Sequence, residues 1–328
     1  MTGRVGASDA GAGTVRVARM DTPDQRPPSG AQWTISAAGH EAVIVEVGGG
    51  VRTYRHDGTD HLDGYAADEI CPGCAGQVLA PWPNRIRDGR YTFGERSLQL
   101  TLSEPDRGVA IHGLVNWVPW RLVEQSSDAV TVGYDLPPQP GYPWPLRLLT
   151  RWSVGPDGLR AEHEATNLGA EPAPFGFAVH PYLRVPGVAV DDLSMRLPAR
   201  TRLHVDGRLL PIGGTPVAGT EYDWTSPRRI GGARLDLCFG DVIRDDDGGS
   251  VVSLAAPDGA AGVRIWADRE FGWWQVFTGD ALPGERRRRS VAVEPMTCPP
   301  DAFRSGRDVI TLKPGATWRG AWGVRPGA

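Results

Sequence analysis

Five polar positions in this 328-residue chain lie beside proline, glycine or aromatic residues within otherwise apolar segments. They are Asn84-Arg85 in PWPNRI, His112 in AIHGLVNW, His180 in FGFAVHPYL, Asp236 in ARLDLCFGD and Glu294 in SVAVEPMTCPP. Glu294 is the most informative of them because it ends an apolar run that is typical of a buried strand, and carboxylates are rarely buried unless paired or functional. Two histidines, a carboxylate and an arginine together predict acid–base chemistry on a neutral polar substrate.

Each of these positions also has an ordinary structural interpretation. His112, which precedes Gly113, is compatible with a loop histidine that bonds to the backbone, and His180 is compatible with a core residue that closes a buried strand. Asp236 fits a turn, and Arg85 fits a cap at the end of a strand. The rest of the chain has to decide between these interpretations and a catalytic one.

Other chemistries find little support in the sequence. No Gly-x-Ser-x-Gly elbow, phosphate loop ending in Lys-Ser/Thr or His-Glu-x-x-His helix occurs. Cys71 and Cys74 have CxxC spacing, but Cys238 and Cys298 stand 60 residues apart without a second such pair, which argues against a zinc site. The segment CPGCAGQVLAPWP predicts a loop instead of the helix that a thioredoxin-like motif opens. We therefore expect neither a metal nor a redox role.

The charge pattern argues against nucleic acid and membranes as partners. The net charge is −4 and the pI is about 6.0, and no basic face is apparent. No run approaches the ~18 apolar residues that a membrane-spanning helix needs. The arginine run at 286–289 follows DALPGE and is expected to be a solvated loop. Residues 1–31 lack an apolar core with a cleavage site, so we expect a disordered leader and a cytoplasmic protein.

Glycine and proline punctuate the chain in the manner of an all-β protein. The 43 glycines and 29 prolines lie between short apolar runs that recur about every ten residues from Gln32 onward. The segment EAVIVEVGGGVRTYRH predicts two strands separated by a triple glycine, and GPDGL and APDGA predict hairpin turns. No linker divides the chain up to Arg325. We therefore predict a single antiparallel β-sandwich domain over residues 32–328.

Twelve tryptophans add a further indication. Most are expected in the core, but aromatic faces beside Asn, Arg, Gln and Asp side chains are also how proteins commonly hold sugars.

Six segments in one order carry a family resemblance: PWPNRIRDGRYTFG, AIHGLV, HPYL, DLCF, QVFTGD and AVEP. Over about Gln32 to Val324 the chain resembles the aldose 1-epimerases, or galactose mutarotases, and most resembles the bacterial branch with PWPNRI and VEPMT. At the second histidine, HPYL stands in place of a longer asparagine-containing motif, which bears on sugar specificity. The resemblance implies a large antiparallel β-sandwich with the sugar in a cleft on one sheet.

The resemblance also implies roles for the polar residues. Glu294 would be the general base and His180 the general acid of a mutarotation that opens and closes the sugar ring without a cofactor. The substrate-binding residues would be Asn84, Arg85, His112, Tyr182, Asp236 and Gln275. The proline-stiffened turn before Asn84 would fix two polar side chains at the rim of the cleft.

Three alternatives stay open at this point. A hexose-6-phosphate or other 6-modified hexose mutarotase would want basic residues near the 6-position, and Arg85, Arg87 and Arg90 are close in sequence. A non-catalytic sugar-binding protein shares the fold. A glycosidic lyase or hydrolase needs a second carboxylate, for which Asp236 is the candidate. The sequence predicts a small-molecule sugar substrate and a monomer or homodimer, and it does not name the sugar.

Overall fold

The computed structural model describes Thr2 and residues 26–327, so the leader predicted over residues 1–31 lies almost entirely outside the described residues. Within them the chain forms 27 β-strands, one α-helix, α1 (Ala302–Ser305), and four short 3-10 helices. The 3-10 helices are η1 (Pro72–Cys74), η2 (Pro105–Arg107), η3 (Val190–Asp192) and η4 (Gly284–Arg286). The all-β prediction is confirmed.

The largest sheet has nine antiparallel strands. In spatial order they are β10 (Arg121–Gln125), β11 (Ala129–Leu136), β12 (Leu146–Gly155), β13 (Gly158–Asn167), β27 (Thr317–Pro326), β23 (Gly262–Ala267), β22 (Ser250–Ala255), β17 (Ser194–Arg196) and β20 (Arg228–Arg229). The predicted hairpin turns are present: GPDG joins β12 to β13 with Gly158 at φ 96°, and APDGA joins β22 to β23 with Gly259 at φ 71°. Positive φ explains the need for glycine at both places.

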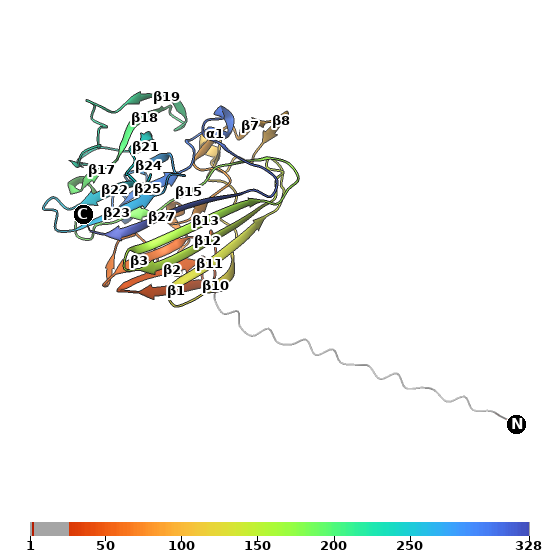
Figure 1. The fold of residues 1–328 in the computed structure, drawn as a ribbon, viewed down its shortest axis with the longest axis horizontal. Coiled ribbons are helices and arrows are strands. Elements are labelled where there is room, and N and C mark those ends of the chain that lie inside the picture. Colours follow the sequence, from red (N-terminus) through yellow and green to blue (C-terminus); the bar gives the residue numbers. More distant parts are fainter. Residues whose placement is uncertain (1, 3–25, 328) are drawn as a thin grey trace.

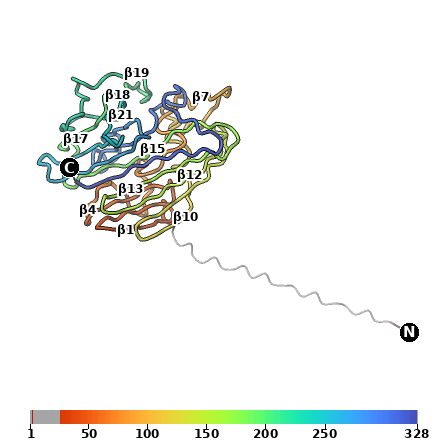
Figure 2. Tube along the Cα trace, in the orientation of Figure 1, coloured from red at the N-terminus to blue at the C-terminus, as the bar shows by residue number. Residues whose placement is uncertain are grey.

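An eight-stranded antiparallel sheet faces the first. Its order is β19 (Pro211–Pro216), β18 (Ala199–Val205), β21 (Asp236–Val242), β24 (Trp273–Phe277), β25 (Val291–Met296), β15 (Ala178–Val179) and β5 (Val78–Leu79), and β16 (Tyr182–Leu183) also pairs with β25. Figure 1 shows β18 and β21 on one side of the molecule and β11 to β13 on the other, with β15 and β27 between them. The Cα trace in Figure 2 shows β18, β21, β15, β12 and β13 in the same places.

Smaller sheets complete the described structure. A four-stranded sheet packs against β11 and β12 and contains β1 (Gln32–Ala37), β2 (His40–Val45), β3 (Val51–His56) and β4 (Thr59–Asp60). Three two-stranded ribbons are β6 (Arg85–Arg87) with β9 (Val109–Ile111), β7 (Arg90–Phe93) with β8 (Arg96–Gln99), and β14 (Ala173–Phe175) with β26 (Ile310–Leu312). The triple glycine separates β2 from β3 as predicted, and a Cβ on Gly49 would meet the Trp120 ring at 2.5 Å.

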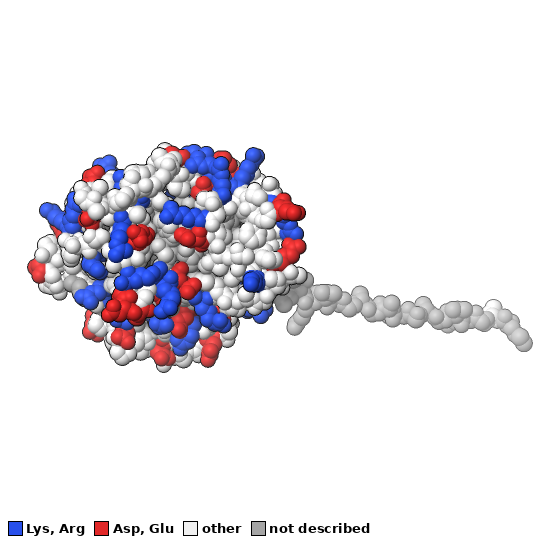
Figure 3. Space-filling model, turned by 45° about the horizontal axis from the view of Figure 1, so that its top comes forward, with Lys and Arg blue, Asp and Glu red and all other residues white. Residues whose placement is uncertain are grey.

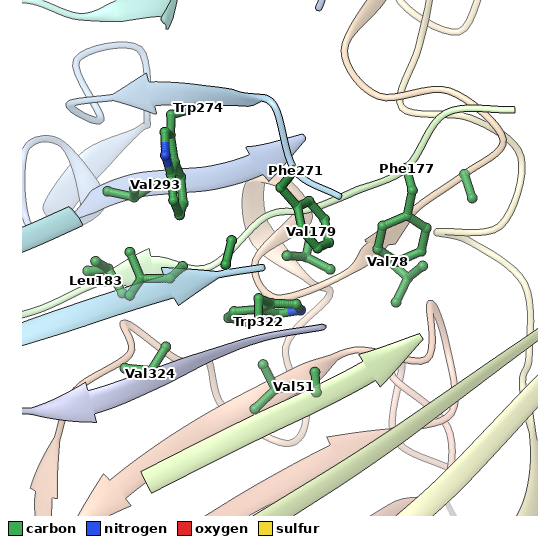
Figure 4. Close-up of a cluster of buried hydrophobic side chains, with 14 of the residues drawn as sticks. Val51, Val78, Phe177, Val179, Leu183, Phe271, Trp274, Val293, Trp322 and Val324 are labelled. Atoms are coloured by element: carbon green, nitrogen blue, oxygen red, sulfur yellow. The ribbon is translucent and has the colours of Figure 1, made fainter. Parts of the chain in front are cut away.

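The main core lies between the two large sheets. Figure 4 shows Trp322 and Val324 of β27 directed towards Trp274 and Val293 of the eight-stranded sheet. All four side chains are at most 1% exposed. Residues of a strand alternate between the two faces of a sheet. Val291, Val293 and Pro295 of β25 therefore face the core, and Glu294 lies on the opposite face of the eight-stranded sheet.

The tryptophans serve the core. Nine of the twelve are buried, and only Trp117 is largely exposed, at 54%. On the face shown in Figure 3, basic and acidic side chains are intermixed, so this face presents no continuous basic surface. No helix among the described residues is long and apolar enough to cross a membrane.

Candidate active site

The register of three neighbouring strands assembles one wall of a cavity. Gln275 of β24 lies between Cys238 of β21 and Glu294 of β25, and Phe277 of β24 lies between Asp236 and Ala292. These two rows are two residues apart on every strand, so all of them share the face turned away from the main core. β16 extends the second row, since Tyr182 pairs with Ala292. His180 precedes β16 and follows the buried strand β15.

The ribbon of β6 and β9 provides the facing wall. Arg85 pairs with Ile111, and His112 follows at once, with its backbone N–H donating to the Asn84 carbonyl at 3.0 Å. Asn84 and His112 have φ of 50° and 61°, left-handed values that are uncommon outside glycine and often mark functional sites. A Cβ on the next residue, Gly113, would come within 2.0 Å of the Ala80 carbonyl oxygen, so the close approach of these segments requires glycine there.

These walls enclose a cavity of about 300 Å³, a size typical of small-molecule sites. Its lining residues are Gly73, Cys74, Asn84, Arg85, Glu104, Arg107, His112, His180, Tyr182, Leu209, Asp236, Phe277, Ala281, Leu282 and Glu294. Seven of the eight residues predicted from sequence are among them. The eighth, Gln275, does not line the cavity itself but donates from Nε2 to the lining residue Asp236, at Oδ1, at 2.6 Å.

A buried imidazole–carboxyl pair lies in this cavity. His180 Nε2 is 3.3 Å from Glu294 Oε1, and the two side chains are only 8% and 3% exposed. The Tyr182 ring stacks on His180 with centroids 4.9 Å apart, and His112 meets it edge-on at 5.4 Å. Aromatic rings on both sides therefore fix the orientation of the His180 imidazole.

Several buried polar atoms of this site have no hydrogen-bond partner within residues 26–327. They are Glu294 Oε2, His180 Nδ1, His112 Nδ1 and Gln275 Oε1. Buried polar atoms are nearly always satisfied, and leaving one unpaired costs roughly 1–3 kcal/mol. The concentration of four such atoms in or beside one cavity indicates a binding site for a polar ligand.

Burial shifts the proton affinities of the pair in opposite directions. Desolvation raises the pKa of Glu294 well above its usual value; nearby Asp236 adds to the increase and Arg85 opposes it. Desolvation also lowers the pKa of His180 to about 4 and holds the pKa of His112 well below its usual range. Both effects disfavour charge in the cavity. The two shifts therefore favour a neutral imidazole beside a protonated carboxyl group, so the His180–Glu294 pair shares one proton.

Sequence reasoning missed several lining residues. Glu104 accepts two hydrogen bonds from Arg85, at 2.7 and 3.2 Å, and Arg107 donates to the same carboxylate at 3.1 Å. These residues come from the turn LSEPDRG, which has no signature of its own. The tryptophan interpretation is not supported for this cavity, because none of the twelve lines it; its aromatic walls are Tyr182 and Phe277. Cys74 also lines it. The CPGC segment, predicted to be a loop, contains the three-residue 3-10 helix η1 and no α-helix.

The arginine run at 286–289 is not a solvated loop, contrary to expectation. Arg286 binds Glu69 through two hydrogen bonds of 2.8 and 2.9 Å, and Arg289 lies 2.9 Å from the buried carboxylate of Asp63. Arg288 pairs with Asp280 and Asp191. The reason for the difference is that Glu69, Asp63 and Asp191 come from segments remote in sequence, whereas Asp280 is only eight residues from Arg288. The ion pairs fix the loop whose residues Ala281 and Leu282 line the cavity.

Comparison with known proteins finds relatives of this chain. The sequence profile of the aldose 1-epimerase family matches residues 31–324. The uncharacterized protein YihR of Escherichia coli K12 is 32% identical over 89% of this chain and 92% of its own length.

Solved structures share the fold. The GalM/aldose epimerase homologue from Caenorhabditis elegans superposes with a TM-score of 0.80 at 16% identity, covering 90% of this chain and 99% of that one. The galactose 1-epimerase of Lactobacillus acidophilus gives 0.75 at 19% identity, covering 90% and 95%. The match to the family profile and to YihR, over nearly the whole of residues 31–324, shows that the chain belongs to the aldose 1-epimerase family.

Proposed function

We propose that this protein is a mutarotase that interconverts the α and β anomers of a neutral hexose. The observation that carries the proposal is the buried His180–Glu294 pair, 3.3 Å apart, beside unpartnered polar atoms in a cavity of about 300 Å³. Mutarotation needs a proton removed from the C1 hydroxyl and another delivered to the ring oxygen. An acid and a base in one cavity supply both transfers.

The ring-opening step starts once the shared proton has passed from Glu294 to His180 across their 3.3 Å contact. Glu294 then takes the proton of the C1 hydroxyl while His180 gives its proton to the ring oxygen. The C1–O5 bond breaks and C1 becomes an aldehyde. Rotation about C1–C2 turns the other face of the aldehyde towards the new hydroxyl, and closure returns both protons. The pair thus holds one proton before and after each half-reaction, with its location exchanged. Each transfer typically contributes ~10²–10⁴-fold to the rate.

The other cavity residues bind and orient the sugar in this proposal. Asn84, Arg85 and Asp236 bind hydroxyl groups, and Gln275 holds the Asp236 carboxylate through its hydrogen bond of 2.6 Å. Neutral His112 donates or accepts at the ring oxygen or at a hydroxyl. Tyr182 provides an apolar wall and fixes His180. Orientation of this kind can lower the barrier substantially because the reacting groups are held near the attack geometry.

A 6-phosphorylated or otherwise 6-modified sugar is the second candidate. Arg87 and Arg90, which are close to Arg85 in sequence, do not line the cavity: Arg87 lies 3.4 Å from Asp206, and Arg90 donates to Gln99 at 2.8 Å. Arg107 is a second guanidinium on the wall, but it shares Glu104 with Arg85. The cavity thus has two guanidinium groups and three carboxyl groups, those of Glu104, Asp236 and Glu294. This balance of charge favours a neutral hexose over a phosphate ester.

The activity of the wild-type protein tests the proposal. Polarimetry of freshly dissolved α-D-glucose and α-D-galactose should show mutarotation faster than in buffer alone, with matching curves from ¹H NMR of the anomeric protons. Acceleration with hexose 6-phosphates alone would support the second candidate. Binding of a hexose without acceleration would identify a non-catalytic sugar-binding protein and refute the proposal.

The pH dependence of the rate follows from the shared proton. Because the pKa of His180 is lowered to about 4, the pair gains a second proton only in that region, so kcat/KM should stay level from neutral pH down to about 5 and fall towards pH 4. The pKa of Glu294 is raised, so the pair keeps its single proton well above pH 4.5 and loses activity on the alkaline side. Initial rates between pH 4 and 9, corrected for buffer catalysis, check this. An acid limb at pH 6–7 would contradict the lowered pKa of His180.

A further inference from the structure

The guanidinium of Arg85 is held from one side by a carboxylate that faces the same cavity. Arg85 Nε and Nη2 donate to Glu104 Oε2 and Oε1 at 2.7 and 3.2 Å, and the Arg85 side chain is only 10% exposed. Two parallel hydrogen bonds of this kind fix the plane of a guanidinium as well as its position. Nη1 is left without a protein partner among the residues the structure describes.

Glu104 is itself fixed by its turn. Its backbone exchanges hydrogen bonds with Val109 at 3.1 and 3.3 Å, and Val109 belongs to β9, which pairs with the strand that carries Arg85. Arg107 Nε donates to Glu104 Oε1 at 3.1 Å. The carboxylate therefore has a defined place relative to β6 before any sugar binds.

Without this anchor, Arg85 would have other carboxylates to bind. Its charge acts on both Asp236 and Glu294, and it opposes the increase in the pKa of each. A guanidinium freed from Glu104 would be attracted towards these groups. Direct pairing with Glu294 would weaken the base and occupy the space of the substrate.

We propose that Glu104 is a positioning residue, which holds Arg85 in the orientation that binds the sugar and keeps it away from Glu294. This role rests on the proposed mutarotase function. Loss of the anchor should lower kcat/KM by about 10–100-fold, since small displacements of a positioned group can cost this much. Both parameters should change: KM rises because Arg85 no longer binds the hydroxyl groups, and kcat falls because Glu294 is a weaker base.

A double-mutant cycle tests whether Glu104 acts through Arg85. The four proteins are wild type, Glu104→Gln, Arg85→Met and the double variant, with Glu164→Gln as the control because Glu164 forms an exposed ion pair with Arg319. We expect Glu104→Gln to cost 10–100-fold in the wild-type background and less than twofold when Arg85 is absent. Equal costs in both backgrounds, or a cost below twofold in wild type, would overturn the proposal.

A purely structural role of the turn predicts a different pattern. Arg208 joins this turn to a neighbouring one by donating to the Arg107 and Gly108 carbonyls, each at 2.7 Å, without touching Arg85. If Arg208→Ala reproduced the kcat and KM changes of Glu104→Gln, ordering of the turn would explain the effect and the positioning role would be refuted.

One readout needs no substrate, so it separates this proposal from the proposed function. The Nε–H cross-peak of Arg85 in a ¹⁵N NMR spectrum is assigned by its loss in Arg85→Met. We expect this proton to exchange with water at least tenfold faster in Glu104→Gln than in wild type. Unchanged exchange would refute the positioning role even if the protein proved inactive towards every sugar tested, and faster exchange in an inactive protein would leave Glu104 as the anchor of a binding site.

Discussion

The Glu294→Gln variant is expected to lose ~10²–10⁴-fold in kcat/KM for mutarotation, while its fold and its affinity for the sugar change little. Glutamine has nearly the same shape as glutamate, so the wall built by β24 and β25 is kept. It cannot accept the proton of the C1 hydroxyl, and it cannot exchange a proton with His180 at 3.3 Å. His180 would then have to protonate the ring oxygen while no base removes the proton of the C1 hydroxyl.

The same variant should be at least as stable as wild type. Glu294 is 2% exposed and its Oε2 atom has no partner in the described part of the chain. Replacement of a buried, poorly paired carboxyl group by a neutral amide removes a desolvation cost. Higher stability together with lost activity is the pattern expected where a strained site has been kept for function.

Polarimetry and urea denaturation of the two proteins measure both effects, and Glu164→Gln serves as the exposed control. Full activity in Glu294→Gln would refute the assignment of the base. A loss of activity accompanied by a large loss of stability would instead indicate a structural role for the carboxyl group.

The pair proposed here as acid and base could be selected from the sequence for a definite physical reason. Glu294 lies inside the buried strand β25, which continues to Met296 instead of ending at Glu294 as the sequence predicted, and His180 directly follows the buried strand β15. Both are polar residues among apolar neighbours, and such positions are costly to fill unless they serve a purpose. The alternation of β25 places Val293 in the core and Glu294 on the opposite face. A charged residue directly beside an apolar one can therefore be recognised from the local sequence alone. The antiparallel sandwich was predictable for similar reasons, since spacing and turn glycines are local signals.

Residues that depend on contacts distant in the sequence could not be found in this way. Glu104 becomes part of the site only because its turn packs beside Arg85, 19 residues away. The sequence around the arginines at 286–289 predicts a solvated run, because Glu69 and Asp63, the partners of Arg286 and Arg289, are more than 200 residues away. A high tryptophan content is also typical of sugar-binding proteins, yet most of the tryptophans here are buried in the protein core.

Removal of one of those core tryptophans should have the largest effect on stability. Trp322 is fully buried between the sheets (Figure 4), and its Nε1 donates to His163 Nε2 at 2.8 Å. Trp322→Ala is expected to reduce the free energy of unfolding by about 3–5 kcal/mol, because it leaves a cavity and also leaves the buried Nε2 of His163 without its partner.

Trp117→Ala is the matched control: Trp117 is 54% exposed, and its loss should change the free energy of unfolding by no more than ~0.5 kcal/mol. Urea denaturation measures both. If Trp322→Ala were no more destabilising than the control, the packing of the two sheets described above would be wrong. The cavity lies on the other face of the eight-stranded sheet, so folded Trp322→Ala should keep kcat within a few-fold of wild type at 25 °C. Stability and catalysis would then be separable, because the residues of β25 alternate between the two faces of the sheet. Val293 packs in the core and contributes to stability, whereas Glu294 faces the cavity and would contribute to catalysis.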